Sequence, residues 1–221
     1  MILTRDTSYI GTLIDDLVTK GTQEPYRIMT SRSEYRLLHR QDNADQRLTA
    51  IGAAVGLVPQ AHLDAVNAKY AAVRQEIRRL ETSGIPGSPA LNGMLTARDT
   101  APVENSARLA DLLRRPQISY EDLAPFDPER PALPLSVTEE VEIQLKYAGY
   151  LARQEKQVAE FKKEEARLLP EDIDYTAIQG LRLEARQKLQ EIHPLSLGQA
   201  GRISGVSPAD IAVLMIYLEG K

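Results

Sequence analysis

The side chains that most often perform chemistry in proteins are few and widely separated in this sequence. Cysteine is absent, which excludes thiolate nucleophiles, disulfides and cysteine-ligated zinc. The three histidines, His39, His62 and His193, are too scattered to form a metal site from one helix. No serine lies in the context of a nucleophile elbow, and no glycine-rich phosphate loop follows a strand. We therefore expect no catalytic residue, no metal site and no cofactor-binding residue in this segment.

Two adjacent acids, Asp15 and Asp16, are the one pair that could suggest a metal site. They lie on the polar side of a predicted amphipathic helix that starts near Ile10 and ends before Lys20, and adjacent positions of a helix point about 100° apart. No third ligand is apparent in the sequence. We expect these acids to form a solvated or salt-bridged helix face.

A run of arginines between residues 27 and 47 rises above this background. Ser31 and Glu34 fit a capping box, which predicts a short helix through about Arg40. On such a helix Arg32, Arg36 and Arg40 would project from one face, because they are four residues apart. Guanidinium groups bind phosphate oxygens in a bidentate manner, so the stripe would suit a nucleic-acid backbone. The alternative is that the arginines pair with nearby acids or a neighbouring domain. The candidate phosphate contacts are Arg27, Arg32, Arg36, Arg40 and Arg47.

The second pattern is in the C-terminal tail, where a small residue at 201, a glycine at 205 and Ile211 have helix-turn-helix spacing. A DNA-reading helix needs polar and basic side chains. Here the second helix, 209–218, is apolar nearly all round and contains no Lys or Arg, which favours core packing or a protein partner. The candidate partner-binding residues are Gln199, Arg202, Ile203, Val206, Ile211 and Leu214. The alternative is a helix-turn-helix DNA-binding regulator with a coiled-coil dimer arm from Leu63 to Leu80.

Composition sets the limits within which these patterns must be read. The 221 residues suffice for one or two domains with an apolar core, and 43% of them are hydrophobic. No apolar run approaches the ~20 residues of a membrane span, and no signal peptide is apparent, so we expect a cytoplasmic protein. The net charge of −4 means that any contact with nucleic acid must come from a local basic surface.

The elements that position these residues are predicted to be helices, which makes the fold all-α. Stripes of apolar residues over 59–82 and from Ser136 to about 169 predict a pair of long helices that pack against each other. Capping signals at Ser196 and at Ser207-Pro208 mark further helix starts. Other helices are expected over 42–52 or 42–56, 106–114 and 182–191, with a loop over 83–102 and a minor extended piece near 26–29. This predicts a helical segment over 1–58, a domain of long antiparallel helices over 59–169 and a helix-turn-helix-like subdomain over 170–221.

Short motifs at both ends of the chain resemble one known family in the family's own order. The N-terminal motifs are GTLIDDLVTKG at 11–21, EPYR at 24–27, TSRSEYRL at 30–37 and DNAD at 42–45. The C-terminal motifs are DY at 174–175, GL at 180–181, EAR at 184–186, GQA at 198–200 and RISGV at 202–206. They resemble the glucose-inhibited division protein A family, also called MnmG. The sequence departs from the family at Arg182, His193 and Gly201, where Ser, Arg and Ser are usual.

The resemblance implies the C-terminal helical part of a homodimeric, FAD-dependent tRNA modification enzyme. Members act with the GTPase MnmE and use FAD, NADH and a folate-derived one-carbon unit. They add an aminomethyl or carboxymethylaminomethyl group to C5 of the tRNA wobble uridine. The flavin and NADH sites would lie in preceding domains, so we expect this chain to be part of a longer protein. The resemblance further implies that residues 1–58 dock onto the FAD domain, that this region contacts tRNA and that the terminal helices bind MnmE.

Overall fold

The computed structural model describes residues 1–20 and 24–219, and its secondary structure is mainly helical. The α-helices are α1 Tyr9–Thr19, α2 Ala44–Ala54, α3 Gln60–Thr82, α4 Pro89–Ala97, α5 Leu109–Leu113, α6 Leu135–Glu165, α7 Leu183–Ile192, α8 Leu197–Arg202 and α9 Pro208–Glu219. The 3-10 helices are η1 Thr30–Arg32 and η2 Glu121–Phe126, and the strands are β1 Gly84–Pro86 and β2 Ser106–Arg108. The predicted all-α class is confirmed. Within the described residues, no helix has the length and apolar character needed to cross a membrane.

The chain folds into two compact units. Unit 1 comprises Met1–His39 and Arg153–Lys221, and unit 2 comprises Arg40–Ala152. The first predicted segment, 1–58, is therefore divided after His39, and its first part joins the C-terminal helices. Helix α6 contributes residues to both units.

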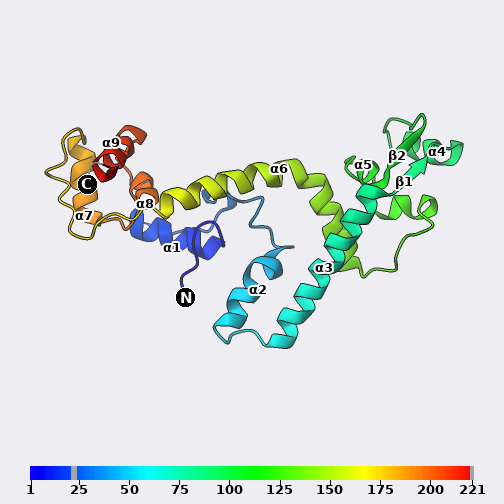
Figure 1. Cartoon of the computed structure of the whole chain (residues 1–221), viewed down its shortest axis with the longest axis horizontal. Helices are drawn as coiled ribbons and strands as arrows, with labels where there is room; N and C mark the ends of the chain where they lie inside the picture. The colour runs from blue at the N-terminus through cyan, green and yellow to red at the C-terminus, as the bar shows by residue number, and fades with distance from the viewer. Residues whose placement is uncertain (21–23, 220–221) are drawn as a thin grey trace. The chain divides into compact units, whose positions relative to one another are not determined.

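Unit 2 contains the helical hairpin of α2 and α3, with β1, β2, α4 and α5 gathered near the C-terminal end of α3 (Figure 1). The stripe predicted on α3 forms core, because Val66, Tyr70, Val73 and Leu80 are buried. They share this core with apolar residues from the first turns of α6, namely Val137, Val141 and Leu145. Burial of such stripes is the main source of helix stability in a folded protein.

The loop predicted over 83–102 is wrong, since this stretch contains β1 and α4. Ser88 is the N-cap of α4, and its Oγ accepts a hydrogen bond from Leu91 N at 3.1 Å. Pro89 occupies the first helical turn, where a proline loses no intrahelical hydrogen bond. Strand β1 pairs antiparallel with β2, with Ile85 opposite Ala107. The helix expected over 106–114 is correspondingly shorter, because β2 takes its first residues.

The short helix predicted from Ser31 is also wrong. Only η1 forms there, and Ser33 then adopts an extended conformation with ψ of 121°. The capping box fails because the Glu34 carboxylate accepts hydrogen bonds from the Arg5 guanidinium at 2.7 and 2.9 Å instead. The contact of Glu34 with Arg5, 29 residues earlier in the sequence, thus replaces the local capping contact with Ser31.

The C-terminal part of unit 1 is a small bundle of α7, α8 and α9 around its own core. Leu189, Leu197 and Leu214 are among its buried residues. The predicted helix starts are confirmed: Ser196 Oγ accepts a hydrogen bond from Gln199 N, and Ser207 Oγ from Asp210 N. Within the described residues the strands are β1 and β2, so the extended piece expected near 26–29 is not a strand. In α6, Ser136 lies inside the helix, which begins at Leu135.

Candidate nucleic-acid and partner interfaces

Helix α1 is built with its polar side inward. Its N-cap is Ser8, whose Oγ accepts a hydrogen bond from Gly11 N, and Thr12, Asp16 and Thr19 are buried. The apolar side chains are exposed: Ile10 by 51%, Ile14 by 52%, Leu17 by 40% and Val18 by 61%. Of the two alternatives expected for Asp15 and Asp16, a solvated or a salt-bridged face, the salt-bridged one is confirmed. A helix whose apolar side faces outward presents a surface suited to another protein part.

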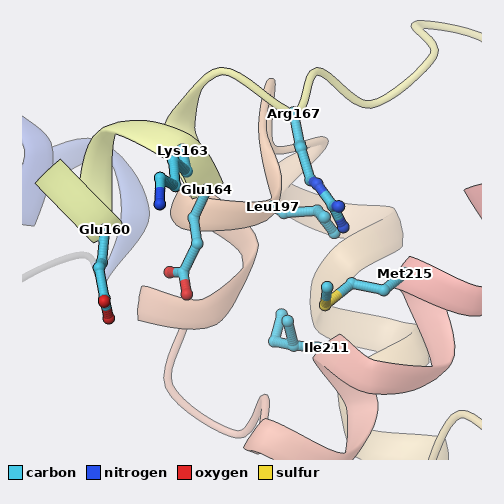
Figure 2. Close-up of a pocket in the computed structure, with 7 residues that line it drawn as sticks. All are labelled: Glu160, Lys163, Glu164, Arg167, Leu197, Ile211 and Met215. Atoms are coloured by element: carbon cyan, nitrogen blue, oxygen red, sulfur yellow. The ribbon is translucent and has the colours of Figure 1, made fainter.

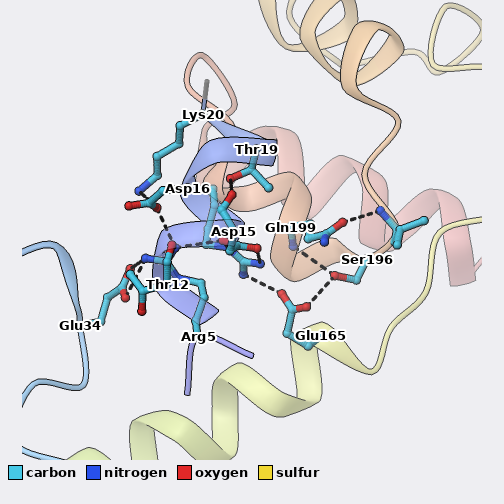
Figure 3. A network of polar contacts seen from close by, with 12 residues as sticks. Arg5, Thr12, Asp15, Asp16, Thr19, Lys20, Glu34, Glu165, Ser196 and Gln199 are labelled. Carbon is cyan, nitrogen blue, oxygen red and sulfur yellow. Dashed lines mark hydrogen bonds and ion pairs between the residues drawn. The ribbon is translucent and has the colours of Figure 1, made fainter. Parts of the chain in front are cut away.

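The buried side of α1 is organised by Arg5, whose side chain is 2% exposed (Figure 3). Its Nη1 donates to Asp16 Oδ1 at 2.7 Å and to Asp15 Oδ2 at 3.0 Å, while Nη2 bonds Glu34. The segment that carries Arg5 passes close over α1 because Gly11 has no side chain. A Cβ at Gly11 would lie 2.1 Å from the backbone oxygen of Thr4.

Two further donors complete the coordination of Asp16. Lys20 Nζ lies 2.9 Å from Asp16 Oδ1, and the Tyr26 hydroxyl donates to Asp16 Oδ2 at 2.8 Å. Burial by itself raises the pKa of Asp16, but the hydrogen bonds from Lys20, Tyr26 and Arg5 outweigh it and hold that pKa below its usual value. Asp16 therefore stays ionised inside the protein.

Arg202 on α8 connects the bundle to this network. Its Nε and Nη2 donate to the two carboxylate oxygens of Asp15 at 2.8 Å each, and its Nη1 donates to Glu165 at 2.6 Å. Ser196 Oγ also donates to Glu165, at 3.1 Å. Close approach of α8 depends on Gly198, where a Cβ would lie 2.1 Å from Glu165 Oε1. A charged network with these short contacts joins α1, α8 and the end of α6.

The predicted arginine stripe is not formed, because its members belong to different units and to no common helix. Arg27, Arg32 and Arg36 lie in unit 1 and are exposed. Among the residues that the structure describes, none of the three has an ion-pair partner. The guanidinium carbon of Arg32 lies 4.6 Å from the centroid of the Tyr26 ring, which orients it without neutralising it.

The other two candidate arginines are in unit 2 and are engaged there. Arg40 Nη2 lies 2.9 Å from Asp42 and 3.5 Å from Glu140. Arg47 donates to the Asn43 side chain at 2.9 Å and to the backbone oxygen of Arg40 at 3.1 Å. These contacts fix the start of unit 2 against α2 and α6, and they leave Arg40 and Arg47 less available for a phosphate.

The six candidate partner residues also divide by burial. Ile203 and Leu214 are 2% and 0% exposed and belong to the bundle core. Arg202 is held in the ion-pair network, and Gln199 Oε1 accepts a hydrogen bond from Leu195 N at 2.8 Å. Val206 and Ile211 are partly buried against the same core. Of the six, Ile211 also lines a groove.

That groove has a volume of about 260 Å³ and lies between the end of α6 and α9 (Figure 2). Leu197, Ile211 and Met215 provide its apolar lining. Charged residues from α6 and from the segment just after it line it as well, namely Glu160, Lys163, Glu164 and Arg167. An apolar floor beside charges of both signs is the usual composition of a protein–protein contact.

Sequence reasoning missed other exposed apolar residues on the bundle. Leu183, Leu195 and Ile216 are each more than half exposed. Ile216 also lines a second, uncharged groove of about 340 Å³ with Val213 and Tyr217. The signal was present in α9, because a short helix that is apolar all round cannot bury every side at the edge of a small bundle. Within the described residues, no group of three or more His, Asp or Glu residues is arranged to hold a metal ion.

These features define a helical module with exposed arginines and apolar grooves. Residues 60–155 match the family model for the tRNA modifying enzyme MnmG/GidA C-terminal helical domain, and residues 157–221 match that for its C-terminal helical bundle. The chain belongs to the MnmG/GidA family, as its C-terminal helical region. The family resemblance predicted from the motifs is confirmed, and the DNA-binding alternative has no support.

The relatives are much longer than this chain. It is 53% identical over 99% of its length to the tRNA uridine 5-carboxymethylaminomethyl modification enzyme MnmG of Caldicellulosiruptor saccharolyticus, and 50% identical to that of Geobacillus thermodenitrificans. It spans 35% of each of these proteins. A crystal structure of Aquifex aeolicus GidA superposes on all of this chain with a TM-score of 0.82 at 39% identity, and the chain covers 34% of it.

Proposed function

We propose that this chain is the tRNA- and partner-binding region of an FAD-dependent enzyme. With the GTPase MnmE, that enzyme would add aminomethyl or carboxymethylaminomethyl groups to C5 of the tRNA wobble uridine. Family membership supports the activity, since the curated relatives carry its name. The observation that carries the role of this region is the exposed arginine group of unit 1. FAD and NADH would be bound by the portion of the longer relatives that this chain does not span, and the whole protein would be a cytoplasmic homodimer.

Arg27, Arg32 and Arg36 of unit 1 are suited to tRNA because they are charged, exposed and not neutralised by a described residue. Arg36 can be tested alone, by measuring the affinity of the chain for tRNA over a series of salt concentrations. Arg36→Gln should weaken binding and reduce the slope of log K against log salt by about one, the value expected for one phosphate contact. The matched control is Lys188→Gln, which removes an exposed charge of the same unit that Glu191 already neutralises at 3.1 Å. An unchanged slope for Arg36→Gln would remove this residue from the proposed contact.

The outward apolar side of α1 is proposed as the surface on which the FAD domain rests. Its four side chains are aliphatic, and packing them against another domain would gain roughly 25 cal/mol for each Å² of apolar area removed from water. Arg202 would then connect a helix docked on the catalytic part to the bundle that binds the partner. Residues 1–39 would thus link the FAD domain to the C-terminal bundle.

The GTPase MnmE is proposed to insert an apolar side chain into the groove of Ile211 and Met215. Met215→Glu would place a charge on the groove lining, and we expect at least tenfold weaker binding of MnmE in a titration calorimetry experiment. The control is Leu183→Glu, an exposed apolar position that does not line this groove. Equal affinities of the wild type and Met215→Glu would exclude the groove, provided that circular dichroism shows an intact bundle.

A further inference from the structure

A second group of exposed arginines lies in unit 2, apart from the residues singled out by sequence. Arg74 and Arg78 are four residues apart on α3, and Arg108 ends strand β2. All three are exposed. In the part of the chain that the structure describes, none of them forms an ion pair.

Most of the other arginines of unit 2 pair with a carboxylate. Arg115 instead donates to the neutral oxygens of Thr100 and Ala101 and is only partly exposed. Arg79 binds the carboxylates of Glu76 and Asp127 at 2.8 and 2.5 Å. Arg98 lies 2.5 Å from Asp122. Arg114 is held by Glu81 and Asp111 at 3.0 and 2.7 Å. Arg79, Arg98 and Arg114 thus each have a carboxylate partner. Among the described residues, Arg74, Arg78 and Arg108 have none.

The fold places Arg74 and Arg78 one turn apart on α3 and Arg108 near the C-terminal end of the same helix. Arg74 and Arg78 lie on its solvent side, since Val73 and Leu80 face the core, and four residues of helix rise about 6 Å. Strand β2 is held to the end of α3, because Leu109 N donates to Ser83 O at 3.0 Å. The pair Ile85–Ala107 packs on the core, so Arg108 on the next residue points outward.

We propose that Arg74, Arg78 and Arg108 form a second phosphate-binding surface for the backbone of tRNA. This rests on the proposed function, and it extends the nucleic-acid contact from unit 1 to unit 2. A nucleic acid is favoured over an acidic protein because the exposed neighbours on α3 are Ala71, Gln75 and Thr82, and the nearby acid Glu81 is paired with Arg114. A protein interface needs a large apolar or aromatic anchor at its centre, whereas phosphate contacts need only cations and small polar groups.

The test is tRNA binding by the 221-residue chain at several salt concentrations. The double variant Arg74→Gln/Arg78→Gln should reduce the slope of log K against log salt by about two, and further substitution of Arg108→Gln by about one more. The control, Arg98→Gln/Arg114→Gln, removes the same charge from exposed but neutralised positions and should leave the slope unchanged. Circular dichroism confirms that each variant is folded.

The outcomes separate this inference from the proposed function. If the wild-type chain does not bind tRNA, both are overturned. If it binds and Arg36→Gln weakens binding while Arg74→Gln/Arg78→Gln does not, only the surface on unit 2 is overturned. An equal loss in the control would also overturn it, because total charge would then explain the effect. Binding of poly-glutamate that depends on Arg74 and Arg78, with tRNA binding unaffected, would assign the surface to an acidic protein instead.

Discussion

Helices α1 and α3 have similar patterns of apolar residues, yet they use them in opposite ways. Helix α3 buries its stripe, with Val73 and Leu80 almost fully inaccessible. Helix α1 buries Asp16 and Thr12 and leaves its aliphatic side chains outside. An apolar pattern thus identifies a helix reliably, but it does not say which partner covers the apolar side.

The two helices differ in which residues cover their apolar sides. The stripe of α3 is covered by residues of its own unit, so its packing is complete within this chain. For α1, the chain supplies a buried cation, Arg5, for the polar side, whereas Ile14 and Val18 stay 52% and 61% exposed. We infer that ion pairs and hydrogen bonds on its polar side stabilise α1 in this chain, and that its apolar side can pack against another domain.

The largest effect should come from removing the cation beneath α1. Arg5→Met would remove the buried one of the two cations that pair with Asp16, and loss of one partner of a buried ion pair costs about 3–5 kcal/mol. We expect the free energy of unfolding of unit 1 to fall by that amount in urea denaturation followed by circular dichroism. Arg153→Met, at an exposed position of the same unit, should change it by less than about 0.5 kcal/mol. A small effect of Arg5→Met would mean that α1 does not depend on its polar side.

On α3 the corresponding loss should come from an apolar residue. Leu80→Ala removes buried methyl groups and leaves a cavity, which costs about 3 kcal/mol in comparable cores. The measurement is the same urea titration, read for unit 2. Thr82→Ala, exposed at the end of the same helix, serves as its control. If Leu80→Ala were nearly neutral, the α3 stripe would not be the source of stability that its burial indicates.

Acid should distinguish the two helices. The pKa of Asp16 is lower in the folded protein than the value of about 3.9 for an unfolded chain, so its ionised form stabilises the fold above that pH and the effect is lost as the pH falls below it. Asp16→Asn should cost about 2 kcal/mol at pH 7, through loss of hydrogen bonds to a charged group, and much less near pH 2. Asp172→Asn, an exposed acid of unit 1, should show no such dependence. A cost of Asp16→Asn that is the same at both pH values would contradict this account.

The smallest effect is expected on the outward side of α1. Ile14→Gln should change the free energy of unfolding of this chain by less than about 0.5 kcal/mol, because the side chain is already half exposed. Val73→Gln on α3 should cost several kcal/mol, since it buries an amide in the core. A large destabilisation by Ile14→Gln would show that the apolar side of α1 is covered within the chain itself.

The sequence predicted the elements whose signals are local. The period of α3 and the caps at Ser196 and Ser207 were sufficient, because a stripe or a cap depends only on residues a few positions apart. The loop predicted over 83–102 fails because serine and proline are common in loops, and here Ser88-Pro89 is the start of helix α4. Strands of three residues are too short to show an alternating pattern.

The candidate sites were harder, because their geometry depends on contacts between distant parts of the chain. The hydrogen bonds from Arg5 to Glu34 remove the predicted helix and with it the common face of the arginines. The burial of Leu214 follows from the packing of the bundle, which apolar spacing alone does not specify. The sequence shows which residues are cationic, so Arg32 and Arg36 remain candidates. It does not show which arginines pair with a carboxylate in the folded protein.

A single missing side chain in α1 has consequences for how this region can vary. Any larger residue at position 11 would displace the backbone at Thr4. The Arg5 guanidinium, on the next residue, would then move away from Asp16. Asp15 and Asp16 would then each lose one partner, although neither acid had changed. The ion pairs of this region therefore depend on Gly11, a residue that has no charge and no side chain.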